Sequence, residues 1–189
     1  MPLLGPGDPL VRRPQRVLVA GTSGAGKTTL AARVGTVLDL PHIEIDALFH
    51  GPDWVPRTTF DDDVRRFADG PRWTTEWQYD SVRPLLAERA DLLVWLDVPR
   101  SRVMTQVVRR TLRRRLLRQQ LWNGNVEPPL RTFLTDPEHI VRWAWTTHGR
   151  TAERVRELGH QRPELPVVRL PDRRAADAWV AGPLTRVAS

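Results

Sequence analysis

The feature that most constrains the fold is a glycine-rich turn between two apolar patterns of different period. Residues 16–21, RVLVAG, are a short apolar run ending in glycine, which is typical of a buried strand. From Lys27 to Leu38 the period becomes that of a helix, and DLP at 39–41 ends it. The apolar residues at helical spacing are Leu30, Val34, Val37 and Leu38. The sequence therefore predicts a strand, a tight turn and a helix in direct succession.

The rest of the chain repeats this alternation. Four more strands are expected, over residues 42–46, 72–77, 91–99 and 166–170. Helices are expected over residues 60–68, 81–90 and 101–121, from Asp136 onward, and from Asp172 to about 181. The alternation predicts a three-layer α/β/α fold with a mainly parallel five-stranded sheet. We expect one domain over residues 15–182, between tails at 1–14 and 183–189.

The composition excludes several classes of protein. The 189 residues contain no cysteine, which excludes a disulfide framework, thiol catalysis and a cysteine-ligated zinc site. No apolar stretch approaches the roughly 20 residues of a membrane-spanning helix, and the N-terminus lacks the apolar run of a signal peptide. We therefore expect a cytoplasmic protein without a membrane partner. Its net charge of +7 predicts anionic partners.

The glycine-rich turn itself matches a phosphate-binding motif. Residues 21–28, GTSGAGKT, fit G-x-x-x-x-G-K-[ST] between a strand and a helix, the context that confirms such a match. Its glycines let backbone N–H groups turn inward around a phosphate, and the helix that starts there adds the positive end of its dipole. Lys27 is the only lysine among 29 lysine and arginine residues. A compact ammonium suits this cradle, whereas the planar fork of an arginine would fill it badly.

The motif also predicts the cofactors, which are ATP and Mg²⁺. Lys27 is expected to reach the β- and γ-phosphates, and the Thr28 hydroxyl to bind Mg²⁺. The expected nucleotide-binding residues are Gly21, Thr22, Ser23, Gly24, Ala25, Gly26, Lys27, Thr28 and Thr29. A guanine site of the N-K-x-D type needs a second lysine, which the chain lacks, and no LSGGQ signature is present. What remains is a compact kinase-like enzyme.

In these motifs the chain resembles the small nucleotide- and shikimate-kinase-like P-loop enzymes, and more narrowly the adenylate-kinase-related DNA topology modulation proteins. The resemblance follows, in order, the P-loop (residues 21–28), HIEIDALFHGPDWV, RWTTEWQY, LLVWLDVPRS and an arginine-rich stretch. Two motifs depart from the group. Its second strand typically ends in Asp-x-Leu-Phe-Trp, where this chain has His50 in last place. Its third typically has Asp-Gly-Asn-Tyr, where this chain has Glu76-Trp77-Gln78-Tyr79.

Two acids are candidate catalytic residues, because open α/β sheets bind ligands at the carboxyl ends of their strands. Asp46 can accept the proton of an attacking hydroxyl or orient the acceptor, or it can be an ordinary turn or helix-cap aspartate. Glu76 can hold Mg²⁺ through a water, or it can be an exposed strand-end carboxylate. Asp97, in WLDVP, is a third acid. The resemblance puts the metal acid on the preceding strand and so favours Glu76 over Asp97.

Six arginines lie between residues 109 and 118. An apolar stripe at i, i+4 spacing accompanies them and consists of Met104, Val108, Leu112 and Leu116. In the resembled kinases this position is a mobile lid, over about 101–136 here, whose arginines clamp the transferring phosphoryl group. The resemblance thus implies catalytic roles for Arg109 and Arg113. The alternative is a solvated charged face.

Two functions are consistent with these features. The favoured one is an ATP-dependent phosphotransferase that moves the γ-phosphate to a small metabolite or nucleotide. The alternative is a nucleic-acid-associated ATPase or nucleotide-dependent regulatory protein whose arginine run contacts a phosphate backbone. No RNA-binding or helix-turn-helix signature favours the alternative. No motif identifies the acceptor or the oligomeric state.

Overall fold

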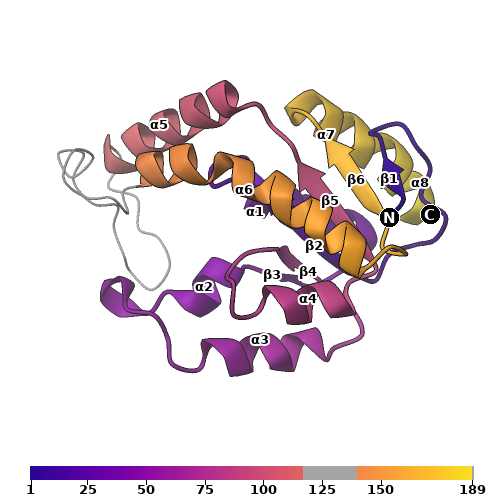
Figure 1. The fold of residues 1–189 in the computed structure, drawn as a ribbon, viewed down its shortest axis with the longest axis horizontal. Helices are drawn as coiled ribbons and strands as arrows, with labels where there is room; N and C mark the ends of the chain where they lie inside the picture. The colour runs from indigo at the N-terminus through magenta and orange to yellow at the C-terminus, as the bar shows by residue number, and fades with distance from the viewer. Residues whose placement is uncertain (117–139, 189) are drawn as a thin grey trace.

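The computed structural model describes residues 1–116 and 140–188, and the side chains of residues 1–109 and 149–188. In this part of the chain, six strands form one parallel sheet in the order β1-β6-β5-β2-β4-β3 (Figure 1). The strands are β1 (Leu3–Leu4), β2 (Arg16–Gly21), β3 (His42–Ile43), β4 (Trp73–Glu76), β5 (Leu92–Leu96) and β6 (Val167–Leu170). The predicted α/β class and parallel sheet are confirmed, with one strand more than expected.

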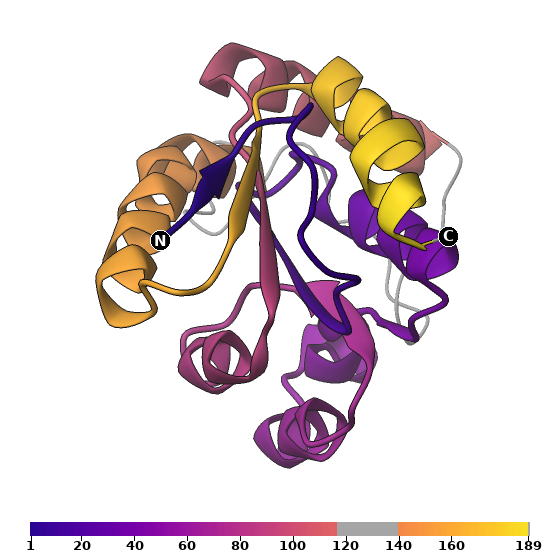
Figure 2. The same ribbon diagram turned by 90° about the vertical axis from the view of Figure 1, so that its right-hand side faces the viewer.

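Helices cover both faces of this sheet (Figures 1 and 2). The face with Val17 and Val19 of β2 carries α1 (Lys27–Leu38), α5 (Arg100–Leu116), α7 (Arg173–Trp179) and the π-helix η4 (Val180–Leu184). The face with Leu18 and Ala20 carries α3 (Phe60–Ala68), α4 (Arg83–Arg89) and α6 (Ile140–Gln161). Successive residues of β2 therefore enter two separate cores, which is why this strand is apolar throughout.

Both expected tails contribute to the folded structure. Leu3 and Leu4 form β1, which pairs in parallel with Val167 and Val168 of β6, so the expectation of a tail over 1–14 is corrected there. A two-residue strand is too short to show alternation in a sequence. At the other end, η4 and α8 (Thr185–Ala188) continue the chain beyond α7, and Leu184 is fully buried. The expected tail over 183–189 is corrected in the same way.

The second expected strand is shorter than predicted. It ends at Ile43, and α2 (Ile45–Phe49) begins two residues later. Asp46 therefore lies in the first turn of α2 and not at the end of a strand. The cause is a hydrogen bond from outside the segment, because Glu76 Oε2 accepts the Ile45 N–H at 3.1 Å. This bond satisfies an N–H that the start of a helix leaves without an intrahelical partner.

Two predicted helix starts have different outcomes. Asp172 caps α7 as expected, since its Oδ1 accepts the Ala175 N–H at 2.9 Å. The helix expected from Asp136 is observed as α6 from Ile140 onward, and residues 136–139 lie outside the described residues, as do 117–121 of the helix expected over 101–121. Within the described ranges, no helix combines the length and the apolarity needed to cross a membrane.

Candidate active site

The P-loop joins β2 to α1 and has the backbone of an anion site. Gly24 and Gly26 adopt φ angles of 84° and 98°, which residues with a side chain rarely adopt. Gly26 directly precedes α1, so the first N–H groups of that helix face the loop. The Lys27 side chain is nearly buried, and its Nζ donates to the Thr22 carbonyl oxygen at 3.3 Å. A positive helix end and a confined ammonium thus lie together, as anionic phosphate oxygens require.

The P-loop packs directly against α5, the helix with which the predicted lid over about 101–136 begins. A Cβ atom at Gly24 would lie 2.2 Å from Val107 Cγ2 and 3.8 Å from the Val103 carbonyl oxygen. Such a short separation means that only glycine fits between the loop and this helix. The position of the P-loop is therefore coupled to that of α5.

Gly24→Ala is expected to destabilise the fold through two effects. The left-handed backbone adds strain of about 1–2 kcal/mol, and the overlap with Val107 adds about 1–3 kcal/mol. Gly26→Ala is the matched control, because Gly26 has a similar φ but no neighbouring atom within 4 Å of its Cβ position. Urea denaturation should give a larger loss of unfolding free energy for Gly24→Ala. Equal losses of unfolding free energy in the two variants would show that the contact between Gly24 and α5 does not contribute to stability.

The donor groups of the P-loop fit a magnesium–nucleotide complex. Thr28 is the second residue of α1 and is half-buried, and Ser23 is half-buried as well. Among the described residues, no group of three or more His, Asp or Glu side chains could hold a metal ion. Mg²⁺ normally takes one or two protein ligands and completes its shell with phosphate oxygens and waters. Thr28 would supply a protein ligand of this kind, beside phosphates held by Lys27 and the loop.

Glu76 ends β4 and is fully buried beside β2, where it is paired with Val19. Its Oε2 accepts the Ile45 N–H at 3.1 Å, and its Oε1 lies 3.3 Å from His42 Nε2. Burial is the largest influence and acts to raise the pKa of Glu76, but the hydrogen bonds from His42 and the backbone outweigh it. The pKa therefore lies below its ordinary value. The alternative that Glu76 is an exposed carboxylate at a strand end is therefore wrong. Its proposed role in holding Mg²⁺ through a water stays a prediction.

Glu76→Gln is expected to lower the free energy of unfolding at pH 7 by about 1–3 kcal/mol, since the new amide cannot accept from both donors. The pKa of Glu76 is lowered from 4.5 by folding, so its ionised form stabilises the fold above pH 4.5. That contribution is lost as the pH falls through the lower folded-state pKa. Urea titrations should therefore show that the difference in unfolding free energy between wild type and Glu76→Gln becomes smaller at acidic pH. The exposed Glu88→Gln variant is the control, and a gap independent of pH would contradict this account.

Asp46 is held by the segment that follows β4. Gln78 Nε2 and Tyr79 Oη both donate to Asp46 Oδ1 at 2.7 Å, and His50 Nε2 lies 3.4 Å from Tyr79 Oη. Burial raises the pKa of Tyr79 and the Asp46 charge raises it further, so the phenol keeps the proton that it donates. Burial lowers the pKa of His50 despite the opposing Asp46 charge, which leaves a neutral imidazole at pH 7. Asp46 is thus a carboxylate of fixed orientation.

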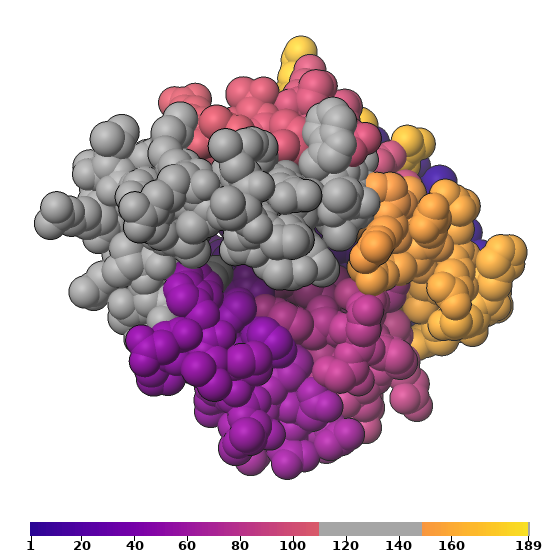
Figure 3. Space-filling model, turned by 60° about the vertical axis from the view of Figure 1, so that its left-hand side comes forward, coloured from indigo at the N-terminus to yellow at the C-terminus, as the bar shows by residue number. Residues whose placement is uncertain are grey.

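Gln78 and Tyr79 belong to a motif that the sequence analysis noted, but nothing in the sequence indicated that they bind Asp46. Gln78 and Tyr79 are 32 and 33 residues away from Asp46, and Tyr79 has a left-handed φ of 62° that no local pattern indicates. The violet segment with α2 and α3 lies beside the magenta segment that follows β4 (Figure 3). Phe49 of α2 stacks on the Tyr79 ring with centroids 4.1 Å apart, which fixes the phenol further.

The remaining candidate residues, and the Trp77 that departs from the family motif, lie elsewhere. Asp97 Oδ2 pairs with Arg169, at 2.7 Å from Nε and 2.6 Å from Nη2, so this acid is held on β6's side of the sheet. Trp77 is buried in the core, where its indole N–H donates to the Arg83 carbonyl oxygen at 3.1 Å. Arg109 is exposed on α5. The Arg113 side chain and residues 117–136 of the predicted lid lie outside the described residues.

Comparisons with known proteins bear on the fold. No family model matches the chain, and no curated protein matches it either. Among solved structures, it is similar to a gluconokinase from Sinorhizobium meliloti 1021, with a TM-score of 0.52 and 20% identity over 94% of this chain and 95% of that chain. It also matches a shikimate kinase from Acinetobacter baumannii in complex with shikimate, with a TM-score of 0.47 and 16% identity over 87% of this chain and 88% of that chain.

A further match is a shikimate kinase from Bacteroides thetaiotaomicron, with a TM-score of 0.43 and 16% identity over 89% of this chain and 95% of that chain. At 20% identity, the likeness to the gluconokinase extends over nearly the whole of both chains and concerns their architecture. Three features of the chain agree with this likeness in architecture: the six-stranded parallel sheet, the glycine loop after β2 and the helices on both faces of the sheet. The chain therefore has the fold of the small P-loop kinases.

Proposed function

We propose that this protein is a kinase that transfers the γ-phosphate of ATP to a small metabolite or nucleotide. The observation that carries the proposal is the position of two groups at the carboxyl edge of one parallel sheet. Lys27 lies nearly buried in the P-loop after β2, and Asp46 is held by donors from the segment after the neighbouring strand β4. A phosphate site and an oriented carboxylate, held by the segments that follow two adjacent strands, are the two parts that phosphoryl transfer to a hydroxyl requires.

The residues of the P-loop would bind the phosphates of the nucleotide. Bound Mg-ATP supplies the phosphoryl group and the charge of the metal ion. Lys27 neutralises charge on the β- and γ-phosphates, and the N–H groups at the start of α1 and the loop donate to phosphate oxygens. The Thr28 hydroxyl and Glu76, the latter through a water, remain the proposed groups for Mg²⁺. Arg109 and Arg113 remain the proposed lid arginines.

Asp46 would act on the acceptor. Its Oδ1 is occupied by Gln78 and Tyr79, and this fixes the plane of the carboxylate. Asp46 then orients the acceptor hydroxyl and accepts its proton as the bond to phosphorus forms. The raised pKa of Tyr79 keeps its phenol protonated, so Tyr79 donates to Asp46 and does not compete with it for the proton of the acceptor.

The test is a transfer assay with ATP labelled in its γ-phosphate. Nucleotides, sugars and hydroxy acids are offered one at a time, and labelled products are separated from free phosphate. The proposal predicts at least one acceptor that becomes labelled at a rate well above ATP hydrolysis. Hydrolysis without a labelled acceptor across the whole panel would contradict a kinase.

A further inference from the structure

Residues 50–56 form a narrow hairpin between α2 and α3. A β-bridge joins His50 to Pro56, and the Gly51 N–H donates to the Val55 carbonyl oxygen at 2.8 Å. The hairpin begins one residue after α2, the helix that carries Asp46. Whatever its tip presents is therefore held close in sequence and structure to the proposed acceptor site.

The tip of the hairpin has an unusual residue for its backbone. The Val55 N–H donates to the Pro52 carbonyl oxygen at 3.1 Å, which closes a turn with Asp53 and Trp54 at its centre. Their φ angles are 53° and 61°, as in the two-residue turns that normally contain Asn-Gly. Aspartate tolerates this conformation, but a bulky side chain such as tryptophan rarely adopts it. The turn alone would favour glycine or asparagine at position 54.

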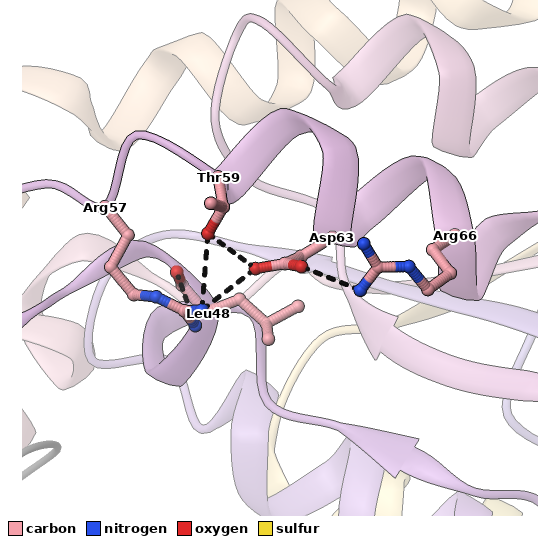
Figure 4. Close-up of polar contacts among 5 residues, drawn as sticks. All are labelled: Leu48, Arg57, Thr59, Asp63 and Arg66. Atoms are coloured by element: carbon pink, nitrogen blue, oxygen red, sulfur yellow. Dashed lines mark hydrogen bonds and ion pairs between the residues drawn. The ribbon is translucent and has the colours of Figure 1, made fainter.

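The base of the hairpin is clamped, so that the strained turn persists (Figure 4). Arg57 donates to Asp63 at 3.0 Å, to Thr59 Oγ1 at 3.3 Å and to the Leu48 carbonyl oxygen at 3.5 Å. Asp63 also accepts from Thr59 Oγ1 at 2.9 Å and from Arg66 at 3.0 Å. This cluster links Arg57, the residue that follows the hairpin, to Leu48 of α2 on one side and to Asp63 of α3 on the other.

Trp54 belongs to a run of contacts that begins at Asp46. Its half-buried indole lies edge-on to the His50 ring with centroids 5.0 Å apart. His50 Nε2 in turn lies 3.4 Å from Tyr79 Oη, which donates to Asp46. The hairpin therefore places a large aromatic surface beside the groups that orient the proposed proton acceptor.

We infer that Trp54 is a binding residue of the acceptor site and that the acceptor contains a ring that stacks on the indole. The inference rests on the proposed kinase function. It explains why a bulky aromatic side chain occupies a left-handed position that glycine or asparagine would occupy without strain. The rings of cyclic polyols and hydroxy acids and the bases of nucleotides all present a flat face to an indole, whereas open-chain acceptors do not.

The test compares acceptor affinity with fold stability in three variants. Trp54→Asn removes the indole and keeps a residue that tolerates the turn, and it should raise the acceptor KM about 5- to 100-fold with the KM for ATP unchanged. Its melting temperature should stay within about 3 °C of wild type or rise, because the strain is relieved. Trp54→Phe should recover much of the acceptor affinity. Asp53→Asn, at the other central position of the turn, should change neither KM.

The acceptors used are shikimate, myo-inositol and adenosine monophosphate as cyclic probes, with gluconate, glucitol and glycerate as open-chain counterparts. At least one cyclic probe should have a kcat/KM at least tenfold higher than that of any open-chain probe. Which cyclic probe is phosphorylated shows whether the ring of the natural acceptor is a carbocycle or a nucleotide base. Equal use of open-chain probes, or an unchanged acceptor KM in Trp54→Asn, overturns the inference alone. A clear fall in melting temperature with both KM values altered overturns it in favour of a packing role. No transfer by wild type to any probe overturns the proposed function as well.

Discussion

Replacing Lys27 with alanine is expected to lower the rate of phosphoryl transfer by at least about 10²- to 10³-fold. The ammonium is nearly buried at the start of α1, so its charge acts on the phosphates with little screening by solvent. No other lysine exists in the chain to replace it. The measurement is the initial rate of labelled γ-phosphate transfer at saturating ATP and acceptor.

Two controls accompany the Lys27→Ala variant. Its thermal melting curve should resemble that of wild type, because the substitution removes a charge from a confined site without opening the core. Lys27→Arg should not restore the rate, since the guanidinium is larger and prefers bidentate partners. A folded Lys27→Ala variant with a wild-type rate would show that the P-loop does not serve the reaction.

Asp46→Asn is expected to lower kcat for transfer by about 10²- to 10⁴-fold, the range for loss of a general base. Asparagine has nearly the same shape, and its amide oxygen still accepts from Gln78 and Tyr79, so the local structure should persist. What is lost is the ability to accept the proton of the acceptor hydroxyl. Initial rates over a range of acceptor concentrations separate this loss in kcat from a change in KM.

The matched control for Asp46 is Asp62→Asn, a change at a highly exposed carboxylate on α3 that pairs with Arg65. This variant should keep the wild-type rate. ATP binding should be unchanged in both variants, because neither residue belongs to the P-loop. A rate for Asp46→Asn within tenfold of wild type would mean that Asp46 is a helix-start aspartate that anchors Gln78 and Tyr79 and does no more.

The parts of the fold that the sequence predicted are those encoded locally. The strand at 16–21, the glycine turn and the helix over 27–38 have the predicted bounds, because each depends on residue period and glycine chemistry within a short window. The cap at Asp172 is likewise a contact between near neighbours in the chain. Such features need no knowledge of which distant segment lies beside them.

The parts that were missed depend on contacts between distant segments. β1 exists only because β6 offers an unpaired edge to Leu3 and Leu4. Asp46 was expected at a strand end and lies in a helix, since Glu76 binds the Ile45 N–H from 31 residues away. Asp97 is paired with Arg169, 72 residues distant. The candidate acids could be named from the sequence, but their partners could not.

Calorimetric titration of the protein with ATP in the presence of Mg²⁺ tests the central claim most directly, because it needs neither the acceptor nor a catalytic assay. The claim is that Lys27 and the P-loop bind the phosphates of a nucleotide. We predict saturable binding of one nucleotide per chain by wild type, and at least a tenfold loss of affinity in a folded Lys27→Ala variant. No binding by wild type, or equal affinity in the two proteins, would contradict it.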